Sequence, residues 1–237
     1  MKTIFLDFDG VLFDTVLESY LLARYAYFNI SPFEKINKNE YGKFRAVRYL
    51  ITHSWHYYYI MKLIEDRISI ENFSQDFKNA LLDRNIELEN DFDKNFQEKR
   101  VDLINNHFKF WNKLDKPYPF FEKIKHIANN FNIIIVSTKN EEAILRHCYD
   151  YGLNIEECNV IGKDKLKIYG SKCNFLINYI EQNNVKNAVF IDDCKETIEK
   201  CSDITNLTPL VANWGYVASK NEGLSENKIL KIIEENE

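Results

Sequence analysis

The sequence lacks the features that mark membrane, secreted or nucleic-acid-binding proteins. None of its apolar stretches approaches the roughly 18 to 20 residues that a membrane-spanning helix needs. The first residues carry one lysine and an acid at position 7, unlike a signal peptide. A formal net charge of −5 argues against a nucleic-acid partner, because such proteins normally present a basic face. We therefore expect a cytoplasmic protein without membrane or nucleic-acid partners, and leave the oligomeric state open.

Cysteine pairs at metal-binding spacing are also missing. The five cysteines form no Cys-x-x-Cys motif, whereas zinc normally takes such pairs or histidine partners. Their odd number predicts reduced, mostly buried thiols. Glycine and proline are scarce too, at seven and four residues, which we attribute to genome composition rather than to function.

The 237 residues are enough for one α/β domain and a smaller insert, and 45% of them are hydrophobic. Three short apolar runs have the length and composition of buried parallel strands. They are residues 3–8, 133–136 and 188–191. Each finishes on polar groups: Asp7, then Ser137 and Thr138, then Asp192 and Asp193. Because open parallel sheets bind ligands at the carboxyl ends of their strands, these groups are candidates for chemistry.

Helical periodicity separates these runs. The predicted helices are residues 143–151, 173–181 and 225–234, and residues 159–161 and 209–212 could be further strands. This order predicts an α/β fold: a Rossmann-like parallel sheet core with helices on both faces.

Residues 15–115 differ from the rest of the chain. They hold one proline, Pro32, and one glycine, Gly42, with apolar and charged residues at spacings of three and four. Such a block is too long for a crossover helix and predicts an inserted helical domain, with Pro117 and Pro119 marking the return to the sheet. The predicted domains are residues 1–14 and 116–237 for the α/β core and 15–115 for the insert.

The acids at the predicted strand ends suggest a metal-assisted reaction. Clustered carboxylates repel one another unless a cation or a shared proton is present, and oxygen ligands favour Mg²⁺. A carboxylate beside Mg²⁺ can attack phosphorus, and a second acid two residues later can protonate the leaving oxygen. Gly10 supplies the bend that lets Asp7 and Asp9 act together. The simpler alternatives are that these acids, Ser137 and Thr138 only shape turns or cap helices.

These residues carry a resemblance to the haloacid dehalogenase (HAD) superfamily. The run from Asp7 to Val11 resembles its first motif, residues 133–137 its second, and residues 190–193 the Asp-Asp form of its fourth. Residues 211–216 resemble a late strand and turn of the phosphoglycolate-phosphatase-like branch. The resemblance spans most of residues 1–15 and 116–220.

The resemblance implies a role for each matching residue. Asp7 would be the nucleophile and Asp9 the general acid and base, while Ser137 holds the phosphoryl oxygens with a lysine of the third motif. Lys172 fits that lysine best, since it directly precedes a predicted helix. The other candidates for it are Lys163, Lys165 and Lys167. Mg²⁺ would be bound by Asp7, the backbone carbonyl of Asp9 and Asp193, with Asp192 close to it. Thr138 and Lys139 are candidate substrate-binding residues.

In this family an insert at residues 15–115 is a C1 cap, a helical domain that closes over the site and selects the substrate. Arg45 and Arg48 stand three residues apart, so one helix face could present both to an anion. A solvated helix face is the plainer interpretation. The aromatic run at residues 53–59 is better explained by packing between cap helices.

The sequence thus predicts a Mg²⁺-dependent phosphatase that hydrolyses a small phosphorylated metabolite through an aspartyl-phosphate. A phosphomutase of the same superfamily would use the same residues, and a non-catalytic protein that binds a phosphorylated ligand is a further alternative. Dehalogenases of the superfamily lack the acid at the position of Asp9. Phospho-accepting receiver domains order their acids differently along the chain. Substrate and pathway stay open.

Overall fold

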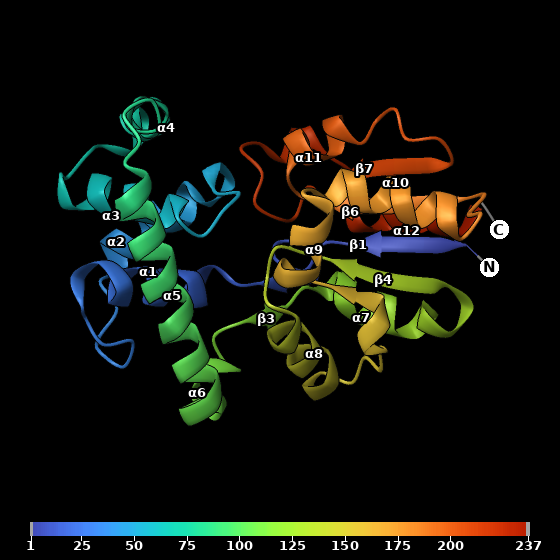
Figure 1. Ribbon diagram of the computed structural model, residues 1–237, viewed down its shortest axis with the longest axis horizontal. Helices are drawn as coiled ribbons and strands as arrows, with labels where there is room; N and C mark the ends of the chain where they lie inside the picture. Colours follow the sequence, from blue (N-terminus) through green and yellow to red (C-terminus); the bar gives the residue numbers. More distant parts are fainter. Residues whose placement is uncertain (1, 236–237) are drawn as a thin grey trace. The chain divides into compact units, whose positions relative to one another are not determined.

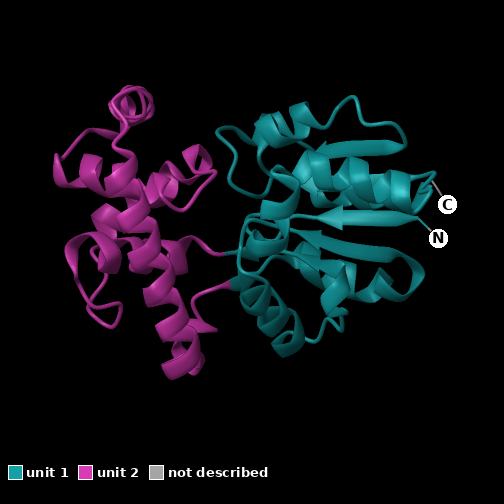
Figure 2. Ribbon diagram, viewed as in Figure 1, with its two compact units in different colours: residues 1–14, 116–237 teal, residues 15–115 magenta. Residues whose placement is uncertain are grey.

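The computed structural model describes residues 2–235 (Figure 1). The chain divides into two compact units (Figure 2). Residues 1–14 and 116–237 form one, called here the sheet unit, and residues 15–115 form the other, the helical unit. None of the helices within residues 2–235 has the length and apolar character that crossing a membrane would take.

The sheet unit contains five parallel strands in the order β5-β4-β1-β6-β7. They are β1 (Thr3–Leu6), β4 (Asn132–Val136), β5 (Val160–Ile161), β6 (Ala188–Asp192) and β7 (Leu207–Val211). The central strand β1 pairs on both sides, with Leu6 opposite Ile135 and Ile191. The predicted α/β class with a parallel sheet is confirmed.

Helices cover both faces of this sheet, as the alternation of side chains along β1 requires. Ile4 and Leu6 belong to one hydrophobic cluster and Phe5 to the other. The first cluster includes residues of α7 (Pro119–Ile127), α8 (Glu141–Asp150) and α12 (Glu226–Glu235), and the second residues of α9 (Lys163–Tyr169), α10 (Lys172–Gln182) and α11 (Lys195–Lys200). Short 3₁₀ turns complete the unit: η2 (Ala128–Asn130), η3 (Glu157–Asn159) and η4 (Lys220–Glu222). Each fully buried Ile or Phe contributes roughly 1.5–3 kcal/mol.

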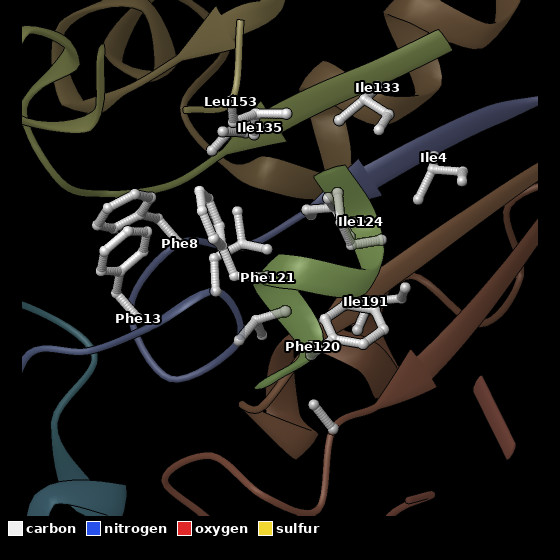
Figure 3. Packing of buried hydrophobic residues seen from close by; sticks show 14 of the residues in the cluster. Ile4, Phe8, Phe13, Phe120, Phe121, Ile124, Ile133, Ile135, Leu153 and Ile191 are labelled. Carbon is white, nitrogen blue, oxygen red and sulfur yellow. The ribbon is translucent and has the colours of Figure 1, made fainter. Parts of the chain in front are cut away.

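The loop after β1 is anchored by aromatic rings (Figure 3). Phe8 and Phe13 stack with centroids 4.7 Å apart, and Phe13 meets the edge of Phe121 at 4.9 Å. The strand was predicted to run to residue 8 but ends at Leu6, because the Phe8 carbonyl accepts from two backbone amides of a tight turn. Within that turn Gly10 has a φ of +85°, a conformation that disfavours other residues. The loop is therefore fixed in shape.

The chain leaves and re-enters the sheet unit at one place. The two-residue strands β2 (Phe13–Asp14) and β3 (Lys116–Pro117) pair antiparallel there. The amide of Tyr118 donates to the carbonyl of Leu12 at 2.9 Å, which continues the pairing. The helical unit is thus inserted directly after the β1 loop.

The helical unit has its own aromatic core. Its elements are α1 (Val16–Phe28), α2 (Lys38–Ala46), η1 (Arg48–Leu50), α3 (His56–Glu65), α4 (Ile70–Ala80), α5 (Ile86–Asn106) and α6 (Phe108–Trp111). Tyr20 meets Phe44, Phe44 stacks on Tyr57, and Tyr57 stacks on Phe96, each with centroids 5.4 Å apart. This chain of rings connects α1, α2, α3 and α5.

A buried ion pair also joins the helices of this unit. The Glu18 side chain is fully buried and accepts from Arg100 Nε at 2.7 Å and Nη2 at 2.9 Å. The indole Nε1 of Trp111 donates to the same carboxylate at 3.2 Å. Three helices therefore share one charged group, and removing its charge would break a buried ion pair.

The prediction of five reduced thiols is wrong for two of them. Cys173 and Cys201 form a disulfide between the first turn of α10 and the end of α11. Packing of these two helices brings the Cα atoms to 5.5 Å, a separation typical of disulfides and invisible in the sequence. Cys148 is a buried thiol, Cys158 an exposed one, and Cys194 lies between these extremes.

Candidate active site

Polar side chains gather at the carboxyl edge of the sheet. Asp7 follows β1, Ser137 follows β4, and Asp192 and Asp193 end and follow β6. All four are buried, with Asp192 fully so. Because the three strands are adjacent and parallel, their carboxyl ends meet at one edge.

Lys172 connects two of these acids. Its Nζ lies 3.0 Å from Asp7 Oδ1 and 2.8 Å from Asp192 Oδ2. It is the first residue of α10, whose N-cap Ser171 accepts from the backbone amide of Asn174. Burial would lower the pKa of Lys172, but the carboxylates of Asp192 and Asp7 outweigh it and raise the pKa. The lysine is therefore a cation at neutral pH.

Asp7, Asp192 and Asp193 form an acidic cluster. Each offers a carboxylate oxygen, and the three oxygens lie within 4.8 Å of one another. Burial raises the pKa of Asp7 to about 6, with Asp192 and Asp9 adding to the rise and Lys172 opposing it. The rise is due first to burial, and a bound cation would oppose it by favouring the ionised form of Asp7.

Two glycines make room for Asp193. A Cβ on Gly215 would lie 2.6 Å from Asp193 Oδ2, and one on Gly10 would clash with the same oxygen. The Tyr216 amide donates to that oxygen in a short hydrogen bond. The indole of Trp214 donates to the Val11 carbonyl at 3.0 Å, which fastens this turn to the β1 loop. The Tyr216 backbone amide therefore holds the carboxylate, and the two glycines leave the space that it occupies.

Ser137 and the two residues after it lie at the end of β4. The Ser137 amide donates to the Ile161 carbonyl at 2.9 Å, and its side chain is buried. Thr138 is exposed, whereas Lys139 is buried with its Nζ 3.2 Å from Asp9 Oδ1. The alternative that Ser137 or Thr138 caps the next helix is wrong, since Asn140 is the N-cap of α8.

Solved structures resemble this chain along nearly its whole length. No protein-family model and no curated protein sequence matches it. A haloacid dehalogenase-like hydrolase from Streptococcus pneumoniae is 10% identical with a TM-score of 0.56, covering 99% of both chains. A protein described as a predicted phosphoglycolate phosphatase from Haemophilus somnus is 12% identical with a TM-score of 0.64, covering 99% of this chain and 98% of that one. The chain has the haloacid dehalogenase-like fold.

A third structure with this fold is a provisionally named β-phosphoglucomutase from Thermotoga maritima. It is 18% identical, with a TM-score of 0.50 and 99% of both chains covered. At such low identities, the structural similarity establishes a shared fold only. The chemistry has to be inferred from this chain's own residues.

The donor set of the acidic cluster fits Mg²⁺, the metal that the HAD resemblance implies. Three carboxylates supply hard oxygen ligands, which Mg²⁺ prefers. Burial raises the pKa of Asp7, and a cation bound beside it would favour its ionised form. The absence of a Cβ at Gly10 and Gly215 gives Asp193 its place in the cluster. Asp7, Asp192 and Asp193 are therefore the side chains that would hold the ion.

The competing lysines lie against other groups. Lys165 Nζ donates to the carbonyls of Glu157 and Val160, both at 2.8 Å. Lys167 forms an exposed pair with Asp164 at 3.0 Å. Lys172 contacts Asp7 and Asp192, whereas Lys165 and Lys167 contact these other groups.

Arg45 and Arg48 do not share one helix. Helix α2 ends at Ala46, so Arg45 lies in its last turn and Arg48 in η1, which makes the predicted common helix face wrong. Arg45 is exposed and donates to the Tyr41 hydroxyl at 3.3 Å. Arg48 donates to the Ile51 carbonyl at 3.0 Å and lies over the Tyr57 ring. The sequence offered no glycine or proline to mark this helix end.

Two features of the site were missed from the sequence. Residues 211–216 were identified as a strand and turn, but not as the source of the Gly215 space and the Tyr216 amide that hold Asp193. The pairing of Lys139 with Asp9 was also missed. A glycine after a strand in the same region was the only available signal for the first.

Proposed function

We propose that this chain is a Mg²⁺-dependent phosphatase acting on a small phosphorylated metabolite through a phosphoryl group carried on Asp7. The observation that carries the proposal is the buried cluster of Asp7, Asp192 and Asp193, with Lys172 bridging two of its members. The resemblance of solved hydrolases and phosphatases in fold supports it.

In the first half-reaction, an Asp7 oxygen attacks phosphorus and the bond from phosphorus to the ester oxygen breaks. The electron pair goes to that oxygen, which takes a proton from the Asp9 carboxyl and leaves as an alcohol. Lys172 and Ser137 hold the phosphoryl oxygens, whose charge the lysine balances. Bound Mg²⁺ would neutralise phosphoryl charge and orient the group.

In the second half-reaction, water attacks the phosphorus of the aspartyl-phosphate. The Asp9 carboxylate takes the water's proton, and the bond to Asp7 breaks to release inorganic phosphate. Asp9 therefore returns to its protonated form and Asp7 to its carboxylate form. Both halves need Asp9 within hydrogen-bonding distance of the reacting oxygen.

The central experiment compares the wild type with Asp7→Asn. We expect wild type to release phosphate from an aryl phosphate with Mg²⁺, to lose this activity on chelation, and to regain it when Mg²⁺ returns. Asp7→Asn should fall to the background rate, since an amide is a poor nucleophile. The matched control is Asp164→Asn, an exposed acid paired with Lys167.

Retention of wild-type turnover by Asp7→Asn would exclude the mechanism. A brief reaction with radiolabelled substrate followed by acid quench should label the wild type and leave Asp7→Asn unlabelled. Hydroxylamine should remove the label, as it does from acyl phosphates. A phosphomutase would use the same residues, and transfer of label to a second hydroxyl instead of phosphate release would reveal it.

We further propose that the helical unit is a cap that selects the substrate. Support comes from its point of insertion, directly after the loop that holds Asp7 and Asp9. Thr138, Arg45 and Arg48 are the proposed substrate contacts. Replacing either arginine by alanine should raise KM for the true substrate more than for a small aryl phosphate. A panel of phosphorylated metabolites identifies that substrate.

A further inference from the structure

Lys139 is a buried lysine to which the two half-reactions assign no step. Its side chain is 1% exposed, and its Nζ lies 3.2 Å from Asp9 Oδ1. The Asp9 side chain is 19% exposed, so the pair is covered on the lysine side and open on the carboxylate side. Burying an ammonium group costs free energy unless a partner compensates it, and Asp9 is such a partner.

The backbone of Lys139 is fixed on both sides. Its amide donates to Ser137 Oγ at 3.4 Å, and its carbonyl accepts from the Lys163 amide at 2.9 Å. A Cβ on Gly162 would lie 2.6 Å from that carbonyl, so the start of α9 packs closely against it. The lysine therefore extends from a rigid base between β4 and α9.

The ammonium group at the end of the Lys139 side chain lies against the loop after β1. Its Nζ lies 5.6 Å from the centroid of the Phe8 ring, which stacks on Phe13. A cation near the face of an aromatic ring is attracted by the ring's quadrupole. Phe8 and Asp9 are adjacent in sequence, so one loop supplies both the ring near the ammonium group and the carboxylate that pairs with it.

Asp9 has a particular need for such a partner. It precedes Gly10 in a tight turn, and its side chain reaches solvent, where several rotamers are accessible. A general acid must lie within about 2.6–3.2 Å of the oxygen that it protonates. A hydrogen bond from the Lys139 ammonium group to Asp9 Oδ1 removes rotational freedom and leaves Oδ2 to carry and transfer the proton.

We propose that Lys139 is a positioning residue that holds Asp9 for proton transfer to the leaving group, in place of the substrate-binding role expected from the sequence. The inference rests on the proposed function. It predicts that loss of Lys139 harms the substrates whose leaving oxygen needs a proton. A lysine that bound the phosphoryl group would serve every phosphomonoester equally.

The experiment compares two substrates with different leaving groups. Nitrophenolate leaves 4-nitrophenyl phosphate without a proton, whereas the alkoxide of glycerol 2-phosphate must be protonated. The quantity to measure is kcat/KM, which reports the steps up to cleavage of the ester bond and excludes hydrolysis of the aspartyl-phosphate. The variants are Lys139→Met and Lys139→Arg, with Lys167→Met as the control for loss of an exposed lysine.

With the alkyl phosphate, Lys139→Met should reduce kcat/KM about 100-fold, in line with the usual size of general acid catalysis. With the aryl phosphate, the reduction in kcat/KM should be smaller by a factor of at least about ten. Lys139→Arg keeps a cationic donor and should recover part of the alkyl-phosphate rate. Lys167→Met should match wild type with both substrates. Thermal melts of each variant report whether it is folded.

Equal losses with the two substrates, or no loss, would overturn the positioning role. If Lys139→Met does not fold, the test uses the ratio of kcat/KM for the alkyl phosphate to kcat/KM for the aryl phosphate in Lys139→Arg. A ratio below that of wild type supports the positioning role, and an unchanged ratio overturns it. Failure of wild type to hydrolyse either substrate contradicts the proposed function itself. The two failures are therefore distinguishable.

Discussion

Acid should destabilise the helical unit through one histidine, His56. The residue is 8% exposed, and its ring packs edge-on against Trp55 and Phe77, with centroids 4.0 and 5.5 Å away. Burial lowers the pKa of His56 from 6.5 to about 4, helped by the nearby charges of His53 and Arg84. The Thr52 amide donates to Nδ1 at 3.3 Å, a bond that protonation of Nδ1 would abolish.

The sign and size of the effect follow from proton linkage. Between the folded pKa of about 4 and the unfolded value of 6.5, the unfolded state binds more protons. Stability therefore falls as the pH falls through this window. From pH 7 to pH 5 the loss is about 2 kcal/mol, and it approaches about 3 kcal/mol below pH 4, at roughly 1.4 kcal/mol per pKa unit.

Other groups titrate in the same range, so a matched variant isolates His56. His56→Asn does not titrate, and its carboxamide oxygen can accept from the Thr52 amide as Nδ1 does. In urea unfolding followed by circular dichroism, wild type should lose about 2 kcal/mol more than His56→Asn between pH 7 and pH 5. Equal losses would refute the reasoning, as would an imidazole titration midpoint near 6.5 by nuclear magnetic resonance.

Three further changes test the packing and the site. Glu18→Gln should lower the free energy of unfolding by about 3 kcal/mol, measured in urea, because it removes one charge of a buried ion pair. Gly215→Ala should abolish most Mg²⁺-dependent activity by displacing the adjacent carboxylate, whereas Gly42→Ala, whose new Cβ meets nothing within 4 Å, should keep it. Alkylation of the unfolded, unreduced chain should label three of five thiols, and labelling of all five would contradict the bond between Cys173 and Cys201.

The strands and the acids at their ends could be predicted because both depend on local sequence. Each apolar run is as short as a buried strand and stops at a polar residue, so strand ends and site residues coincide. β6 illustrates this, since residues 188–191 were predicted and Asp192 extends the strand by one. Because the strands pair parallel, the three carboxyl ends must lie at one edge of the sheet, and this too could be predicted.

The contacts of long side chains and the contacts between helices could not be predicted, because they depend on residues far apart in the sequence. Lys139 reaches Asp9 across 130 positions of the chain, and nothing in either segment encodes the rotamers that join them. Cys173 and Cys201 meet because α10 packs on α11, which depends on the whole hydrophobic layer below them. The end of α2 before Arg48 has no breaker residue to announce it.

The charges at the site bear on the proposed need for a metal. Asp7, Asp9, Asp192 and Asp193 lie with two ammonium groups, those of Lys139 and Lys172, so full ionisation leaves an excess of two negative charges. A phosphomonoester dianion would meet repulsion there, strengthened by burial. One divalent cation cancels that excess. In the proposed reaction a divalent cation would therefore relieve the excess charge of the carboxylates, while Lys172 balances charge on the phosphoryl oxygens.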